Sequence, residues 1–220
     1  DGLDALLGGG LRPGSLTYLA GRPGMGATSL AVQAARDLRS GAVLFFSLDE
    51  PASRIRARCG GLGWLIDDMD FLTPAMIRDA LRKRPDAAAA VIDPLELLCP
   101  DSDPNRTREQ EFYERTAALR SLAREFDVPI LCTASLPRSV ENRSDRRPLL
   151  ADLADGIGKD ALACVDRVLF VFRRAYYKNK QISSAELILA KNSLGSTGVV
   201  PCQWTFDWDR GTLVFSEAER

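Results

Sequence analysis

The chain of 220 residues contains no histidine. This absence excludes a Ser-His-Asp triad, a Cys-His dyad, a zinc site with imidazole ligands and an imidazole pH switch. The five cysteines, Cys59, Cys99, Cys132, Cys164 and Cys202, form no C-x-x-C motif, which excludes a thioredoxin-type redox motif and a zinc ribbon. Dispersed cysteines in an odd number are typical of reduced, mostly buried thiols in a cytosolic protein.

The sequence also has little net charge and no long apolar run. Its 29 Lys and Arg residues nearly balance 30 Asp and Glu residues, which argues against a uniformly basic surface for nucleic acid but leaves room for a local basic face. No apolar run approaches the ~18 residues of a membrane span, and the start shows no signal-peptide pattern. We therefore expect a cytoplasmic protein without membrane partners. The length of 220 residues, with no internal repeat or linker, predicts a single domain over residues 1–220.

Short apolar runs alternate with amphipathic segments along most of the chain, and hairpin signals follow near its end. The expected strands cover residues 16–20, 43–48, 87–92, 128–133, 168–172, 185–190, 199–206 and 212–215, and the expected helices cover 28–38, 54–59, 74–84 and 107–126. This order predicts an α/β fold in which helices flank a mainly parallel sheet with an antiparallel C-terminal extension.

Residues 21–28, GRPGMGAT, lie between the first expected strand and helix and match G-x-x-x-x-G-K-[ST] except at the lysine. The glycines let backbone N–H groups surround a phosphate at a helix N-terminus, and Thr28 can offer its hydroxyl to Mg²⁺. Ala27 removes the ammonium that would bridge the β- and γ-phosphates. The alternative is a Gly-rich turn without nucleotide. The candidate residues for ATP or ADP are Gly21, Pro23, Gly24, Met25, Gly26, Ala27, Thr28 and Ser29.

Carboxylates follow two of the expected strands. Asp93 closes a buried strand, as a Walker B aspartate does, so Thr28 and Asp93 are the candidate metal residues. Asp49 and Glu50 follow another strand, where an acidic residue can polarise an attacking water. Their alternative role is to cap the helix that begins near Pro51.

These motifs resemble, in the same order, those of the C-terminal RecA-fold ATPase domain of DnaB-type replicative helicases. The matching stretches are residues 21–29, 46–49, 91–93, 108–124, 126–130, 147–153, 168–173 and 190–198. Members of this family are hexameric motors that hydrolyse ATP between subunits and pull single-stranded DNA through a central channel. The resemblance implies a RecA-like P-loop fold, ATP or ADP with Mg²⁺, single-stranded DNA, self-association, and replication or plasmid-maintenance proteins as partners.

The resemblance also assigns roles, and several assigned positions depart from the family. The catalytic glutamate falls on Asp49, with Glu50 as a possible substitute, and the sensor glutamine falls on Ser135. The trans-acting lysine is kept as Lys191, but the arginine finger is replaced by Ser193. Loss of an arginine finger typically removes 10³–10⁵ in rate.

The departures predict impaired ATP hydrolysis, so that the domain acts as a nucleotide-binding, DNA-binding or assembly module. Two alternatives remain. One is an active helicase or ATPase that uses Glu50 as base and Lys191 or a neighbouring arginine in place of the missing charges. The other is a protein-binding scaffold that acts independently of nucleotide.

Basic residues gather in two segments. The first is the polar stretch 137–148, which faces the DNA channel in the family, and a DNA-contacting loop is expected after Leu153, with Ala154 and Asp155 where the family has Arg-Glu. The alternative for the first segment is a solvated charged loop. The second segment, residues 173–180, is expected to be a hairpin tip or subunit contact rather than a stacking platform for single strands. The candidate DNA-binding residues are Arg138, Arg143, Arg146, Arg147 and Lys159.

Overall fold

The computed structural model describes residues 7, 9–38, 41–60, 64–100, 106–177, 183–193 and 195–218. Within these residues the strands form one mixed sheet in the order β3-β2-β4-β5-β1-β6-β7-β8-β9. The strands from β3 to β6 in this order pair in parallel, and β7, β8 and β9 extend the sheet in antiparallel pairing. Their bounds are β1 Leu16–Gly21, β2 Ala42–Ser47, β3 Leu65–Asp68, β4 Ala87–Asp93, β5 Ile130–Ser135, β6 Arg167–Phe172, β7 Ser184–Asn192, β8 Gly198–Asp207 and β9 Thr212–Glu217.

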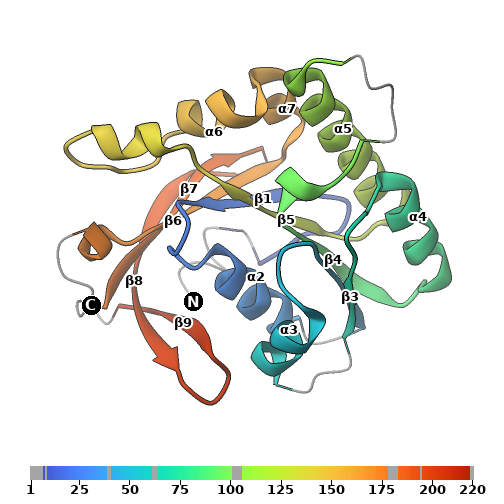
Figure 1. Cartoon of the computed structure of the whole chain (residues 1–220), viewed down its shortest axis with the longest axis horizontal. Coiled ribbons are helices and arrows are strands. Elements are labelled where there is room, and N and C mark those ends of the chain that lie inside the picture. Colours follow the sequence, from blue (N-terminus) through green and yellow to red (C-terminus); the bar gives the residue numbers. More distant parts are fainter. Residues whose placement is uncertain are drawn as a thin grey trace.

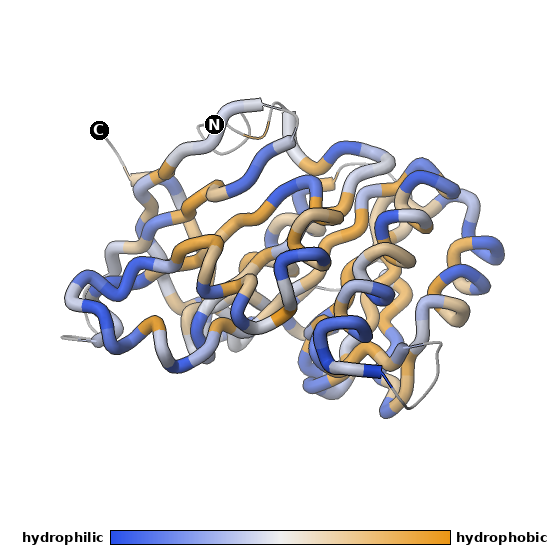
Figure 2. The backbone as a smooth tube through the Cα atoms, turned by 90° about the horizontal axis from the view of Figure 1, so that it is seen from above, coloured by the Kyte–Doolittle hydropathy of each residue, from blue (hydrophilic) through white to orange (hydrophobic). Residues whose placement is uncertain are grey.

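Helices cover both faces of this sheet (Figure 1). The helices are α2 Ala27–Arg36, α3 Ala52–Cys59, α4 Pro74–Lys83, α5 Arg108–Phe126, α6 Leu150–Ile157 and α7 Lys159–Cys164, with short 3₁₀ turns η1 Leu95–Leu97, η2 Arg138–Asn142 and η3 Arg174–Tyr177. One core lies between the sheet and α4 to α7, and a second lies between the sheet, α2 and α3. Figure 2 shows hydrophobic segments in the middle of the molecule and hydrophilic segments around them. This confirms the predicted fold class.

Side-chain alternation along β1 explains how one strand serves both cores. Leu16, Tyr18 and Ala20 face the core beneath α5, whereas Leu19 faces the core beneath α2. Because β1 is buried along its whole length, it reads as a continuous apolar run in the sequence. No helix in the described part of the chain is long and apolar enough to cross a membrane.

Three regular elements were not predicted. Strand β3 has a single buried residue, Ile66, so its hydrophobic signal is too weak to mark a strand. Helices α6 and α7 contain eight and six residues, and Gly158 separates them. The expectation of a DNA-contacting loop directly after Leu153 was wrong, because Ala154 and Asp155 continue α6. Leu153 and Ile157 bury the inner face of that helix, which stabilises it despite its length.

The strand order places the chemical motifs at one edge of the sheet. Strands β2, β4, β5 and β1 are neighbours and run in parallel, so their carboxyl ends lie together. Ser47 pairs with Asp93 at one of these ends, and Gly21 pairs with Ser135 at another. Ligands of open α/β sheets bind at such an edge.

Candidate nucleotide-binding site

Residues 21–28 form a loop that leaves β1 at Gly21 and enters α2 at Ala27. Gly24 and Gly26 have φ angles of 82° and 102°, a region that residues with a Cβ rarely adopt. A Cβ on Gly26 would also lie 2.9 Å from Cδ1 of Leu213 and 3.0 Å from Cζ of Phe215. The local sequence therefore fixes a phosphate-loop backbone, as predicted, and β9 packs directly against it.

Hydrogen bonds from two arginines hold this loop in place. Arg173 is buried, and its Nη1 donates to the Gly24 carbonyl at 3.0 Å while its guanidinium lies 3.8 Å from the ring centre of Trp204. Arg22 donates through Nη1 to the Leu136 carbonyl at 2.6 Å and through Nε to Glu141 at 2.8 Å. Arg173 directly follows β6, which pairs with β7 as an antiparallel hairpin, so the expected position in a hairpin connection is confirmed, but its side chain is buried against the loop. Lys178 and Lys180 of the same basic segment lie outside the described residues.

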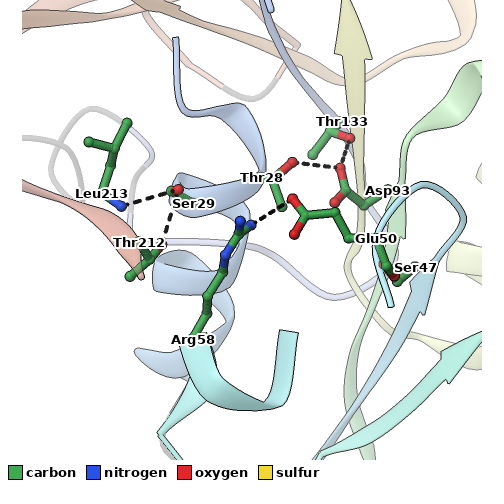
Figure 3. A network of polar contacts seen from close by, with 9 residues as sticks. All are labelled: Thr28, Ser29, Ser47, Glu50, Arg58, Asp93, Thr133, Thr212 and Leu213. Carbon is green, nitrogen blue, oxygen red and sulfur yellow. Dashed lines mark hydrogen bonds and ion pairs between the residues drawn. The ribbon is translucent and has the colours of Figure 1, made fainter. Parts of the chain in front are cut away.

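Asp93 lies at the centre of a hydroxyl network (Figure 3). The Thr28 hydroxyl donates to Oδ1 of Asp93 at 3.1 Å, and the Thr133 hydroxyl donates to the same oxygen. Burial raises the pKa of Asp93, the two hydroxyl groups lower it in part, and the negative charge of Glu50 raises it further. The structure thus brings the two candidate metal residues together, as the motif spacing predicts.

The two candidate carboxylates after β2 lie in different surroundings. Asp49 is exposed, whereas Glu50 is partly buried and its side chain reaches the side of the network that holds Thr28 and Asp93 (Figure 3). The backbone carbonyl of Glu50 accepts a hydrogen bond of 2.6 Å from the Ser47 hydroxyl, which fixes the turn. Glu50 is therefore the better placed of the two to face a bound nucleotide.

Arg58 is a site residue that sequence reasoning missed. Its Nη1 lies 2.9 Å from Oε1 of Glu50. Arg58 belongs to α3, in which Ala52, Ile55 and Cys59 form the buried face. Helical spacing could have indicated this residue. Arg58 lies next to the buried face of α3 and is partly buried, whereas Arg54 is exposed.

The other assigned positions surround the site or lie apart from it. Ser135, at the sensor position, is exposed, and its N–H donates to Oε1 of Glu96 at 2.6 Å. Lys191 pairs with Val168 near the start of β6, far along the strand from the loop, and its Nζ donates to the Leu162 carbonyl at 2.7 Å. Burial lowers the pKa of Lys191. Lys191 is thus not brought to the phosphate loop of its own chain.

The candidate DNA-binding residues divide into two groups. Arg143 makes two bonds of 2.6 Å to the carboxylate of Asp152, and Arg147 binds Glu186 at 2.6 and 2.8 Å, so both guanidinium groups already have acidic partners. The members of the second group lack such an ion pair among the described residues. They are Arg138 and Lys159, which are exposed, and Arg146, whose guanidinium lies 4.6 Å from the ring centre of Tyr177.

Comparison with known proteins agrees with this geometry. The family model of the DnaB-like helicase C terminal domain matches residues 59–210, and that of the KaiC ATPase matches residues 1–98. A probable replicative DNA helicase of Trieres chinensis is 32% identical over 90% of this chain and 52% of its own length. The replicative DNA helicase DnaB of Buchnera aphidicola subsp. Schizaphis graminum is 30% identical over 91% of this chain and 52% of its own length. The chain thus spans about half the length of the curated relatives it matches.

Solved structures show the same fold. A structure described as an ATPase domain superimposes with a TM-score of 0.83 at 25% identity, over 97% of this chain and 88% of that one. A DnaB-like replicative helicase, described with its interactions with primase, gives a TM-score of 0.83 at 24% identity, over 97% of this chain and 60% of that one. The resemblance inferred from the motifs is confirmed.

Proposed function

The chain belongs to the DnaB-like helicase C-terminal domain family, and we propose that it is a single RecA-like domain over residues 1–220 with impaired ATP hydrolysis. It acts in the cytoplasm as a nucleotide-binding, DNA-binding or assembly module in replication or plasmid maintenance. The observation that carries the proposal is the loss of the two cations that stabilise phosphoryl transfer in the family. Ala27 stands in place of the phosphate-loop lysine, and Ser193 stands in place of the arginine finger.

The residues of the site fit a nucleotide with Mg²⁺. A hydroxyl and two carboxylates, from Thr28, Asp93 and Glu50, converge beside the loop, and Oε2 of Glu50 is buried without a hydrogen-bond partner among the described residues. Within the part of the chain that the structure describes, no group of three or more acidic or cysteine side chains forms a metal site by itself. The set beside the loop suits Mg²⁺, which is usually held by one or two carboxylates together with substrate phosphates. Bound Mg²⁺ would neutralise phosphate charge, with Thr28 and Asp93 holding it.

The missing cations act on the charge that develops in the transition state. Loss of an arginine finger costs about 4–7 kcal/mol of transition-state stabilisation, equal to a factor of 10³–10⁵ in rate. Loss of the lysine affects the same charge, so the two effects are not additive. The loop amides and α2 can still bind phosphate, which leaves binding less impaired than turnover.

Titration calorimetry and a turnover assay test this function. Titration with ATP·Mg²⁺ should give weak or no binding, and turnover should stay near background with single-stranded DNA. Ala27→Lys should tighten ATP binding about tenfold, because an ammonium on phosphate forms charge-assisted hydrogen bonds. Robust hydrolysis stimulated by DNA in the unaltered chain would contradict the proposal.

The position of Glu50 favours a second candidate, an ATPase that uses substitute residues. Its carboxylate lies beside Thr28 and Asp93, on the side of the loop where a water-polarising base would act (Figure 3). In that case Glu50→Gln abolishes turnover, whereas Asp49→Asn, which alters the exposed neighbour, retains it. Equal turnover in both variants would exclude this candidate.

A further inference from the structure

A cavity of about 720 Å³ lies between the sheet and the C-terminal half of helix α2. Its volume falls within the range of roughly 300–1,000 Å³ that is typical of small-molecule sites. The described residues that line it include none from the phosphate loop or from the hydroxyl network around Asp93. The apolar side chains of this lining include Leu19, Leu30, Leu131, Leu169, Leu187 and Phe215.

Specific hydrogen bonds fix one wall of this cavity, which is formed by Leu7 and residues 9–11. Arg167 is fully buried, and it donates through Nη2 to the Leu7 carbonyl and through Nη1 to the Gly10 carbonyl, both at 2.9 Å. Gly9 and Gly10 have φ angles of 103° and 97°, which residues with a Cβ rarely adopt. The wall is thus built by defined contacts, and the cavity is more than a chance gap in the packing.

Two polar groups of the lining lack hydrogen-bond partners among the described residues. Thr17 is only 2% exposed, and its hydroxyl is buried and unpaired. Nε of Arg36 is likewise buried and unpaired. An unsatisfied buried donor is costly and rare in folded proteins. Because both groups can donate a hydrogen bond, a molecule with an acceptor oxygen would complement the cavity.

The charges around the cavity favour an uncharged molecule. Arg36, Asp37 and Glu217 all contribute to the lining, and the two acidic residues are exposed. An anion would meet the two carboxylates, and a cation would meet the guanidinium. Either ion would also lose its hydration among the leucine side chains, which is costly.

We propose that this cavity binds an uncharged, mainly aliphatic molecule that carries one acceptor oxygen, as an alcohol does. The alkyl chain lies among the leucines between α2 and the sheet, and the oxygen accepts a hydrogen bond from the Thr17 hydroxyl. Burial of each methylene group should tighten binding about fourfold. The alkyl chain therefore provides most of the affinity, and Thr17 determines where the oxygen lies.

Titrations with octanol, octanoate and octylammonium test the class of ligand, because the three molecules share one alkyl chain. Binding is followed by the amide signals of the full chain in proton–nitrogen NMR spectra. Octanol should shift the signals of the residues that line the cavity, and hexanol should bind about tenfold more weakly because it has two fewer methylene groups. Octanoate and octylammonium should bind at least about tenfold more weakly than octanol, because each buries a charge.

Thr17→Val tests the hydroxyl, since valine keeps the shape of threonine. The variant should bind octanol about five- to tenfold more weakly, through loss of one hydrogen bond. It should also have a higher thermal midpoint without ligand, because the unpaired hydroxyl is gone. Thr205→Val is the matched control: Thr205 is an exposed threonine of β8, and its replacement should leave octanol binding unchanged.

Ala34→Phe tests the location, since Ala34 is a half-buried residue of α2 that lines the cavity. The larger side chain should fill the cavity and abolish octanol binding. The proposal is overturned if octanol shifts no signals of the lining, if either ion binds as tightly as octanol, or if Thr17→Val or Ala34→Phe binds octanol as the unaltered chain does. A titration with ATP·Mg²⁺ on the same sample tests the proposed function separately, because neither result depends on the other.

Discussion

Gln33 and Phe215 are joined by two hydrogen bonds between helix α2 and strand β9. The side-chain amide nitrogen of Gln33 donates to the Phe215 carbonyl at 2.6 Å, and the Phe215 N–H donates to Oε1 of Gln33 at 2.9 Å. One turn earlier, the Ser29 hydroxyl accepts from the Leu213 N–H at 3.3 Å. The helix that follows the phosphate loop thus satisfies the free edge of the last strand, and the strand fixes the helix in return.

Replacing Gln33 by Leu should therefore destabilise the fold. The substitution keeps a side chain of similar size but leaves a backbone donor and acceptor of Phe215 without partners, at a cost of about 1–3 kcal/mol. Urea unfolding followed by circular dichroism measures the free energy of unfolding. Gln203→Leu is the control, because Gln203 is an exposed glutamine of β8. Equal stability of the two variants would show that the Gln33 bonds contribute nothing.

The lowered pKa of Asp152 predicts that the free energy of unfolding decreases at acidic pH. Burial alone would raise its pKa, but hydrogen bonds from Arg143 and from the Leu149 N–H outweigh burial and lower it. A carboxylate with a lowered pKa in the folded state stabilises the fold above its unfolded value of about 3.9, and this contribution disappears as the pH falls through the folded pKa. Asp152→Asn should lower stability at pH 7 and flatten its decline below about pH 4.

The measurement is the free energy of unfolding between pH 7 and pH 3 for the unaltered chain and the variant. Asp155→Asn serves as control, since Asp155 is an exposed residue of the same helix. A decline in Asp152→Asn as steep as in the unaltered chain would mean that other carboxylates cause the acid loss.

Much of the fold and the loop could be predicted because their signals are local. Strand β1, the glycines of the loop and the apolar face of α2 follow one another within about twenty residues, and each carries its own pattern. Asp93 could be placed for the same reason, since it ends an apolar run. The parallel pairing that brings these segments together follows from the alternation of strands and helices.

The partners of the charged side chains could not be predicted, because they come from distant parts of the chain. Arg173 stabilises the loop because its guanidinium donates a hydrogen bond to the Gly24 carbonyl and packs on the ring of Trp204. Arg147 is occupied by Glu186, which lies 39 residues further along. In the sequence, both arginines belong to basic segments in which no local pattern indicates the partner of each side chain. The sequence shows where the charged side chains are, but the fold determines which partner each of them contacts.

The ionised side chain of Asp93 is expected to lower the free energy of unfolding at neutral pH. Burial raises its pKa, and a raised carboxyl pKa in the folded state gives stability that is present at low pH and lost as the pH rises through that pKa. At pH 7 the ionised, buried carboxylate therefore destabilises the fold. Asp93→Asn should raise the thermal midpoint by several degrees and abolish the dependence of nucleotide binding on Mg²⁺.

Differential scanning fluorimetry with and without Mg²⁺ and ATP measures both effects. The unaltered chain should gain thermal stability from Mg²⁺ with ATP, whereas Asp93→Asn should not. A thermal midpoint lowered by Asp93→Asn would mean that the bonds from Thr28 and Thr133 outweigh the cost of burying the charge.

The ion pairs predict which arginines of the segment 137–148 are available to DNA. Arg138 is exposed, whereas Arg143 is held by Asp152 at 2.6 Å through both of its terminal nitrogens. Arg138→Gln should weaken binding of a fluorescein-labelled oligo-dT, measured by anisotropy, and reduce the slope of affinity against salt by about 0.7, the value for one phosphate contact on a single strand. Arg143→Gln should instead lower the free energy of unfolding and leave the slope unchanged at temperatures where the variant is folded. A reduced slope in Arg143→Gln with unaltered stability would show that Arg143 leaves Asp152 to contact DNA.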